Sequence, residues 1–142
     1  MTAGSRHLSV GRAGEDAAAS FLLSLGWRVL DRNWRPRGTD RGLELDIVAL
    51  EGNGLVFVEV KTRSRRGGGI PAYAAFTGQK RARIARAAGY YLSARDMWNI
   101  PCRFDLILVE GGAGGQLMLE HHKNVIELGH LVDSSHASWQ PW

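Results

Sequence analysis

Glu44-Leu45-Asp46-Ile47-Val48-Ala49-Leu50 and Leu55-Val56-Phe57-Val58-Glu59-Val60-Lys61 are two apolar runs of strand length that carry charged residues. Between them, Glu51-Gly52-Asn53-Gly54 contains Asn-Gly, a strong signal for a tight turn. The two runs therefore predict buried strands in an antiparallel hairpin that closes at Asn53-Gly54. Because a buried charge is costly unless it is paired or bound to a metal, the charged residues need a specific partner.

The alternation of side chains along a strand predicts which of these charged residues lie on the same face of the sheet. Glu59 and Lys61 point to the face opposite that of Val58 and Val60, and closure of the hairpin would place Asp46 across from Glu59. Two carboxylates at that separation raise each other's pKa unless a cation lies between them. Mg²⁺ prefers a few carboxylates together with water and phosphate oxygens.

This pattern favours a magnesium site for phosphate chemistry, with Asp46 and Glu59 as ligands. A metal ion in such a site activates water and neutralises charge. Lys61 would act as a base or as a cation that stabilises the transition state. In the alternative interpretation the hairpin lies at the surface, and Glu59 and Lys61 are solvated or pair with each other.

Periodicity predicts the elements before the hairpin. A helix is expected over residues 11–25, with Ser9 as its N-cap and Gly26 as its C-terminal stop. Its apolar residues recur at helical spacing: Ala17, Ala18, Phe21, Leu22 and Leu25. A strand is expected over residues 27–33, with Trp27, Val29 and Asp31 on one side, and a loop over residues 36–42.

The elements after the hairpin complete an α/β pattern. A mobile loop is expected over residues 64–70, and a second helix over residues 77–93 has Thr77 as its N-cap. The apolar face of this helix consists of Ile84, Ala87, Ala88, Tyr91 and Leu92. Strands follow over residues 104–109 and 116–122, so the fold class is α/β with a mixed central sheet. Residues 1–132 would form a single domain and residues 133–142 a poorly ordered tail.

Composition narrows the class of protein and of partner. The chain has 142 residues, is 44% hydrophobic and 23% charged, and carries a formal net charge of +4, which suits one domain with an anionic partner. Cys102 is the only cysteine, which excludes an intrachain disulfide and a cysteine-based zinc site. Residues 1–10 lack the apolar core of a signal peptide, and no run of about 18 apolar residues exists, so we expect a cytoplasmic protein without membrane spans.

The basic residues are unevenly distributed. No acidic residue occurs between Glu59 and Asp96, which indicates a surface that follows a phosphate backbone. The cations in this interval are Lys61, Arg63, Arg65, Arg66, Lys80, Arg81, Arg83, Arg86 and Arg95.

A series of short motifs resembles the YraN-like bacterial family over about residues 8 to 109. They are Gly11-Arg12-Ala13-Gly14-Glu15-Asp16-Ala17-Ala18, Leu30-Asp31-Arg32-Asn33-Trp34-Arg35, Glu44-Leu45-Asp46-Ile47-Val48-Ala49, Leu55-Val56-Phe57-Val58-Glu59-Val60-Lys61-Thr62-Arg63, Lys80-Arg81, Ala88-Gly89-Tyr90-Tyr91-Leu92 and Arg103-Phe104-Asp105-Leu106. That family looks like a member of the PD-(D/E)XK nuclease superfamily, similar to archaeal Holliday-junction resolvases. One departure is Leu43, which stands where the family usually has glycine.

The resemblance implies a restriction-endonuclease-like core with catalytic residues Glu15, Asp46, Glu59 and Lys61. Mg²⁺, with Mn²⁺ as the alternative, would be bound by Asp46, Glu59 and the carbonyl of Val60. Glu15 would complete the site or hold Lys61, or would instead interact with the dipole of the first helical turn.

Three groups of residues are candidate nucleic-acid contacts. Arg63, Arg65 and Arg66 flank a glycine-rich loop that could clamp a nucleic-acid backbone or simply aid solubility. Gln79, Lys80 and Arg83 at the start of the second helix could contact phosphate or form a solvated basic face. Trp34 and Tyr73 could stack on unpaired bases or be packing residues.

The expected function is a metal-dependent endonuclease that hydrolyses phosphodiester bonds of DNA, with branched, Holliday-junction-like DNA as a candidate substrate in repair or recombination. A homodimer would suit a four-way junction, because symmetric cuts need paired sites. One alternative is a non-catalytic nucleic-acid-binding protein that keeps the nuclease fold. Another is an interaction module in repair or transformation machinery, with the tail as its contact.

Overall fold

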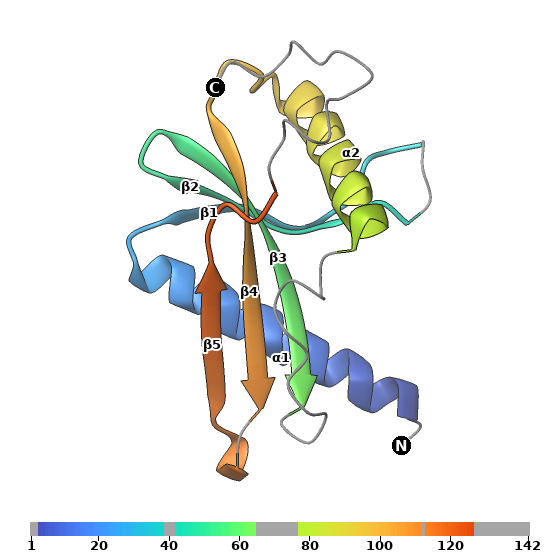
Figure 1. Cartoon of the computed structure of the whole chain (residues 1–142), viewed down its shortest axis with the longest axis vertical. Coiled ribbons are helices and arrows are strands. Elements are labelled where there is room, and N and C mark those ends of the chain that lie inside the picture. Colours follow the sequence, from blue (N-terminus) through green and yellow to red (C-terminus); the bar gives the residue numbers. More distant parts are fainter. Residues whose placement is uncertain (1–2, 39–41, 65–76, 112, 127–142) are drawn as a thin grey trace.

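The computed structural model describes residues 3–38, 42–64, 77–111 and 113–126, which form a five-stranded sheet with a helix on each face (Figure 1). The elements in chain order are α1 (Ala3–Ser24), β1 (Arg28–Trp34), β2 (Leu45–Glu51), β3 (Gly54–Ser64), α2 (Gly78–Arg95), β4 (Cys102–Gly111), a short 3-10 helix (Ala113–Gly115) and β5 (Leu117–His122). Among the described residues, no helix combines the length and the apolar character that crossing a membrane requires.

The sheet is mixed, as predicted, with strand order β1-β2-β3-β4-β5. β3 and β4 are parallel, whereas the other neighbouring strands are antiparallel. A parallel pair needs a crossover connection, and α2 lies in the connection between β3 and β4. The predicted order of elements and the mixed α/β class are therefore confirmed.

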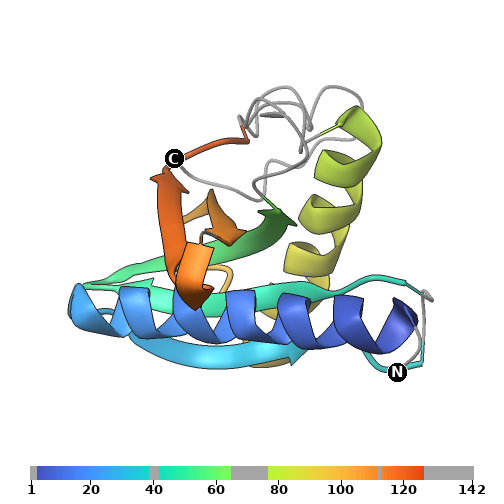
Figure 2. The same ribbon diagram turned by 90° about the horizontal axis from the view of Figure 1, so that it is seen from below.

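The two helices cover opposite faces of the sheet (Figure 2). Ala18, Ala19 and Leu22 of α1 pack with Val56 and Val58 of β3 on one face. On the other face, α2 covers a second apolar cluster that includes Phe57, Phe104, Ile84, Tyr91 and Leu92. The alternation predicted along β3 is confirmed, because Phe57 and Val58 belong to different clusters.

The hairpin forms as predicted, but its turn lies one residue earlier. Glu51 pairs with Gly54, so the two loop residues are Gly52 and Asn53, and Gly54 is the first residue of β3. Gly52 has a φ of 58°, which glycine adopts without steric cost at the first position of a two-residue hairpin turn. The prediction of a turn at Asn53-Gly54 was therefore wrong by one position.

Helix α1 begins earlier than its apolar pattern indicates. Ser9 lies inside the helix and is not its N-cap, and Leu25 is 48% exposed and follows its last residue. Gly26 has a φ of 87°, as expected for a C-terminal stop. Because the helix begins at Ala3, Glu15 is far from the first turn, and the helix-dipole interpretation of that residue was wrong.

Strand β1 contains a bulge that changes which face its residues occupy. The register with β2 shifts between Val29 and Asp31, so Asp31 does not share the face of Val29 as alternation predicted. Asp31 instead accepts hydrogen bonds from Tyr91 Oη at 2.7 Å and from Arg95 at 3.0 Å, both from α2. The bulge thereby ties the edge strand to α2.

Helix α2 confirms the predicted cap and apolar face. The Thr77 hydroxyl accepts a hydrogen bond from the Lys80 backbone N–H at 3.2 Å, as an N-cap does. Its buried residues are Ile84, Ala87, Ala88, Tyr91 and Leu92. The helix ends at Arg95, where the N–H of Asp96, in the left-handed conformation, bonds the carbonyls of the last turn.

Asp105 of β4 is the charged residue that the sheet buries completely, with 1% of its surface exposed. Its carboxylate accepts hydrogen bonds from Arg103 Nε at 3.0 Å and from the Asn124 N–H at 2.9 Å, and it lies 2.9 Å from His121 Nε2. Arg103 also pairs with Glu51 at 3.1 Å. These contacts satisfy the buried carboxylate and fasten β5 and the end of β2 to β4.

Three predicted features lie outside the described residues. These are most of the loop at 64–70, whose first residue Ser64 ends β3, the tail at 133–142, and Tyr73. Leu43, the residue that departs from the family pattern, is buried in the cluster under α2, and the preceding Gly42 has a φ of 89°.

The contact of α1 with β3 at Gly14 predicts opposite effects of two glycine substitutions. A Cβ at Gly14 would overlap Thr62 Oγ1 and lie 3.3 Å from Thr62 Cβ, whereas a Cβ at Gly11 meets nothing within 4 Å. We expect Gly14→Ala to lower the free energy of unfolding by about 1–3 kcal/mol. We expect Gly11→Ala to raise it by about 0.5–1 kcal/mol. Urea unfolding followed by circular dichroism measures both.

Combining Gly14→Ala with Thr62→Ala should recover most of the lost stability, because the overlapping hydroxyl is gone. Equal effects of the two single glycine substitutions would contradict the close contact between α1 and β3.

Candidate functional site

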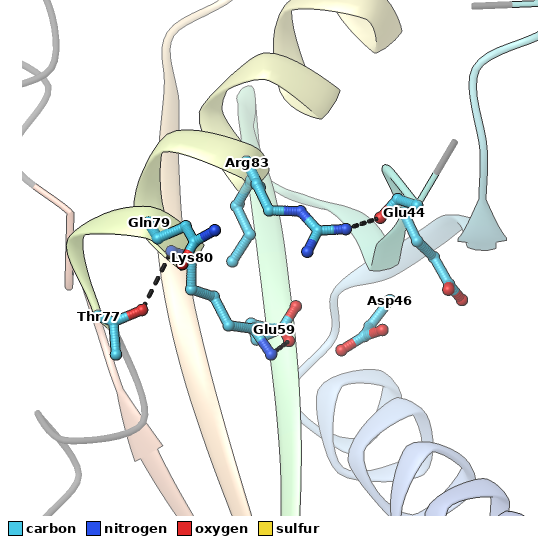
Figure 3. Close-up of a pocket in the computed structure, with 9 residues that line it drawn as sticks. Glu44, Asp46, Glu59, Thr77, Gln79, Lys80 and Arg83 are labelled. Atoms are coloured by element: carbon cyan, nitrogen blue, oxygen red, sulfur yellow. Dashed lines mark hydrogen bonds and ion pairs between the residues drawn. The ribbon is translucent and has the colours of Figure 1, made fainter. Parts of the chain in front are cut away.

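A cavity of about 430 Å³ lies where β2, β3 and the first turns of α2 meet (Figure 3). Its lining combines carboxylates with the basic start of α2. The lining residues are Gly42, Glu44, Asp46, Glu59, Thr77, Gln79, Lys80, Arg83 and Ile84.

The two predicted metal ligands meet where β2 separates from β3. Backbone pairing runs from Glu51–Gly54 to Ile47–Val58, so the next positions are Asp46 and Glu59. There the Asp46 carboxylate accepts a hydrogen bond from the Val60 N–H at 2.9 Å, in place of a backbone carbonyl of β2. The predicted proximity of Asp46 and Glu59 thus has a local cause in the opening of the ladder.

The charged form of Asp46 is disfavoured at this position. Burial, followed by the repulsion from Glu59, raises the pKa of Asp46 from its ordinary value of 3.8 to about 8. Glu15 of α1 adds to the increase, while the hydrogen bond from Val60 opposes it. Without a cation near Asp46, its carboxyl group therefore holds a proton at neutral pH.

Lys80 provides Glu59 with an opposite charge. Its Nζ lies 2.9 Å from Glu59 Oε1, and the Glu59 side chain is only 12% exposed. Lys80 stands in the first turn of α2, which is fixed by the Thr77 cap (Figure 3). The surface-hairpin interpretation is therefore wrong for Glu59, which is enclosed and paired with a residue of another element.

Arg83 fastens the next turn of α2 to the loop before β2. Its guanidinium donates a hydrogen bond to the carbonyl of Gly42. Glycine is favoured at position 42 by its positive φ of 89°, whereas a Cβ there would meet only the movable end of the Arg83 side chain, at 2.7 Å. This contact closes the cavity on the side of Glu44.

The other predicted site residues lie at different distances from the cavity. Glu15 is half-buried on α1 and near enough to raise the pKa of Asp46. Lys61 is exposed on β3, two residues after Glu59, and Arg63 is half-buried further along the same strand. Gln79 lines the cavity. Arg65 and Arg66 lie outside the described residues.

The donor set suits a hard cation such as Mg²⁺, although it is small. The described residues contain no group of three or more acidic, histidine or cysteine side chains that could hold a metal ion. Mg²⁺ is usually bound by one or two protein carboxylates, and water and substrate phosphate complete its coordination. Asp46 and Glu59 can supply the two carboxylates.

Sequence reasoning missed three features of the cavity. It assigned Lys80 to phosphate contact but did not anticipate its pairing with Glu59, which crosses 21 positions of sequence. It also missed Glu44, which pairs with Arg35 at 3.1 Å, and the Arg83 contact with Gly42. The only available signal was the Thr77 cap, which places Lys80 in the first helical turn.

Comparison with known proteins relates the chain to a single family. The model of the uncharacterised protein family UPF0102 matches residues 14–109. The chain is 44% identical over 133 residues to a UPF0102 protein of Lawsonia intracellularis, covering 94% of this chain and 96% of the relative. It is 44% identical over 137 residues to a UPF0102 protein of Nitratidesulfovibrio vulgaris, covering 96% and 97%.

Among solved structures, Pyrococcus furiosus SfsA in complex with Ca²⁺ aligns with 85% of this chain and 65% of its own chain. The TM-score of this alignment is 0.38 and the sequence identity is 14%.

The raised pKa of Asp46 predicts how stability depends on pH in the metal-free protein. Because the folded state holds this proton more tightly than the unfolded state, the free energy of unfolding should fall as pH rises from about 4 to about 8. We expect Asp46→Asn to be about 1–3 kcal/mol more stable than wild type at pH 9 and within about 1 kcal/mol of it at pH 5. Urea unfolding in the presence of a chelator measures the difference.

Asp16→Asn, which removes an exposed acidic group on α1 whose partner at 2.6 Å is the guanidinium of Arg32, is the control and should shift stability equally at both pH values, because arginine does not titrate in this range. A difference between Asp46→Asn and wild type that is the same at pH 5 and pH 9 would contradict the raised pKa.

Proposed function

This chain belongs to the UPF0102 family, in agreement with its resemblance to YraN-like proteins, and we propose that it is a metal-dependent endonuclease with a PD-(D/E)XK-type core. The observation that carries the proposal is the placement of Asp46 and Glu59 side by side in a cavity lined by basic residues of α2. The Glu59-x-Lys61 spacing on the central strand β3 and the helix α1 bearing Glu15 also support it.

Asp46 and Glu59 would hold the divalent cation, together with the carbonyl of Val60. A bound Mg²⁺ or Mn²⁺ supplies activation of water and neutralisation of charge on the phosphate. The chain's own contribution is to keep two carboxylates close, at the cost of their mutual repulsion. Val60 fixes Asp46 through its N–H, and Glu15 adds negative charge nearby.

The basic side of the cavity would bind the phosphate. Lys80 and Arg83 line it, and the first turn of α2 presents a helix N-terminus, where anions are stabilised by backbone N–H groups and the helix dipole. Lys61, exposed on β3 two residues after Glu59, would stabilise charge that develops on the reacting oxygens. The net charge of +4 favours association with nucleic acid.

For the substrate we propose DNA, with branched DNA of the four-way-junction type as the first candidate. This choice rests on the resemblance to resolvases stated above and on the acid-free basic interval between Glu59 and Asp96. A symmetric cut of a four-way junction would require two copies of the chain.

A non-catalytic nucleic-acid-binding role is the second candidate. The observation that favours it is the ion pair of Lys80 with Glu59, since a lysine that neutralises Glu59 can hold α2 against β3 without any metal. In that case the carboxylates would be structural, and the basic residues alone would bind the nucleic acid.

Cleavage of labelled DNA distinguishes these two candidates. We expect the full chain to cut at least one of four substrates, namely four-way junction, flap, single strand or linear duplex, with Mg²⁺ or Mn²⁺. Asp46→Asn and Glu59→Gln should each lower the rate at least about 100-fold, because each removes a proposed metal ligand. Glu120→Gln, on the distant strand β5, should cut like wild type.

Salt-sensitive DNA binding by wild type, without cleavage of any substrate and without Mn²⁺ binding in calorimetry, would reject the nuclease and support the non-catalytic candidate. Absence of DNA binding and of cleavage would reject both.

A further inference from the structure

We call the cavity lined by Asp46, Glu59, Lys80 and Arg83 the carboxylate cavity, and a second cavity of about 300 Å³ lies further along α2. We call it the aromatic cavity. One wall comes from the end of β1 and the residues after it, and the other from the last turns of α2. The lining residues are Trp34, Arg35, Pro36, Arg37, Tyr90 and Ala94.

The aromatic cavity has two aromatic rings in its wall, one from β1 and one from α2. Trp34 is half-buried and packs edge-on against Tyr91, with ring centroids 5.0 Å apart and an angle of 82° between the planes. Tyr90, the neighbour of Tyr91, has 36% of its surface exposed. Aromatic side chains of this kind stack on nucleobases with about 1–3 kcal/mol per base, without regard to sequence.

The charges around the aromatic cavity suit a nucleotide. Arg35 and Arg37 are both exposed in its wall, and the described part of the wall contains no acidic residue. An aliphatic peptide segment would need neither cation, whereas a nucleotide whose base stacks here carries phosphates on both sides. Tyrosine and tryptophan beside arginine is the combination found in single-strand grooves.

Two connections relate the aromatic cavity to the carboxylate cavity. Arg35 in the first pairs with Glu44 in the second at 3.1 Å. Helix α2 also lines both cavities, with Arg83 in one and Tyr90 in the other. Seven residues of helix separate them by about 10 Å, the length of about three stacked nucleotides at ~3.4 Å each.

We propose that the aromatic cavity binds an unpaired nucleobase of the same strand whose phosphate lies at Asp46 and Glu59. This inference rests on the proposed function and narrows its substrate class to nucleic acid with a single-stranded segment beside the phosphate that is bound. A paired base has both faces covered by its neighbours in the duplex, so only an unpaired or flipped base can enter a cavity walled by Trp34 and Tyr90.

Two single-stranded probes of equal charge test the inference. Fluorescence anisotropy would measure the affinity of the full-length protein for two labelled probes, a 12-residue oligothymidylate and an abasic strand of the same length. We expect wild type to prefer the strand with bases at least about fivefold, the lower limit of one stacking contact. Tyr90→Ala should reduce this preference to about onefold, and Tyr90→Phe should retain it.

A second variant and a control keep the test independent of folding. Ala94 is exposed, and Ala94→Glu would fill the cavity and add negative charge at only a small cost in helix propensity and helix-dipole energy in the last turn of α2, so it should also abolish the preference. Leu23→Ala, which changes an exposed residue of α1, should leave the preference unchanged.

The outcomes separate this inference from the proposed function. If wild type cuts DNA or binds both strands tightly but Tyr90→Ala and Ala94→Glu keep the preference for bases, the inference is overturned and the proposed function stands. Equal affinity of wild type for the two strands would likewise overturn the inference and leave the proposed function standing. If wild type neither binds either strand nor cuts any of the four substrates, the proposed function and the inference both fail.

Discussion

The separation of β2 from β3 at Asp46 is the constraint on which the rest of the site depends. Backbone pairing stops after Ile47–Val58, and the Asp46 carboxylate takes over the N–H of Val60. This substitution leaves two acidic side chains adjacent and mostly enclosed, so a second negative charge is unfavourable there and raises the pKa of Asp46. The two helices then act on the pair in opposite directions, because α1 adds the negative Glu15 and α2 adds the positive Lys80. Both helices must be held at fixed positions for this balance to persist. Gly14 seats α1 against Thr62, and Arg83 fastens α2 to the Gly42 carbonyl.

Much of the fold follows from local patterns in the sequence. The hairpin, the order of elements and the buried face of α2 are all consequences of side-chain periodicity, and the Thr77 cap follows from one hydroxyl at the right position. The failures also have physical causes. The turn sits at Gly52 and Asn53 because glycine is preferred at the first loop position of such a turn, which competes with the Asn-Gly signal one residue later. The start of α1 was missed because its first turns lack the apolar periodicity on which the prediction relied.

Only the part of the candidate site that lies within the β2–β3 hairpin was predictable from the sequence. Asp46 and Glu59 come together because a period of two and a two-residue turn fix their register. The pairing of Lys80 with Glu59 depends instead on how α2 crosses the sheet, and nothing local to either residue specifies that distance. The same is true of Asp105, which reads as an interruption in an apolar strand. Its partners Arg103, His121 and Asn124 are revealed only when β4 and β5 are placed side by side.

The bulge in β1 interrupts the alternation of its side chains, so the residues before and after it follow different registers. Val29 lies opposite Ala49 and Asp31 lies opposite Val48, so Leu30 is an extra residue with no position of its own in the ladder. Shortening the chain by that one residue would leave both pairings in place and cost a single partly buried leucine. Removing Arg32 instead would move Asp31 by one position in the ladder and turn its carboxylate to the opposite face, away from Tyr91 and Arg95 of α2. Leu30 is therefore the position at which β1 can lose a residue while it keeps both its pairing with β2 and its contact with α2.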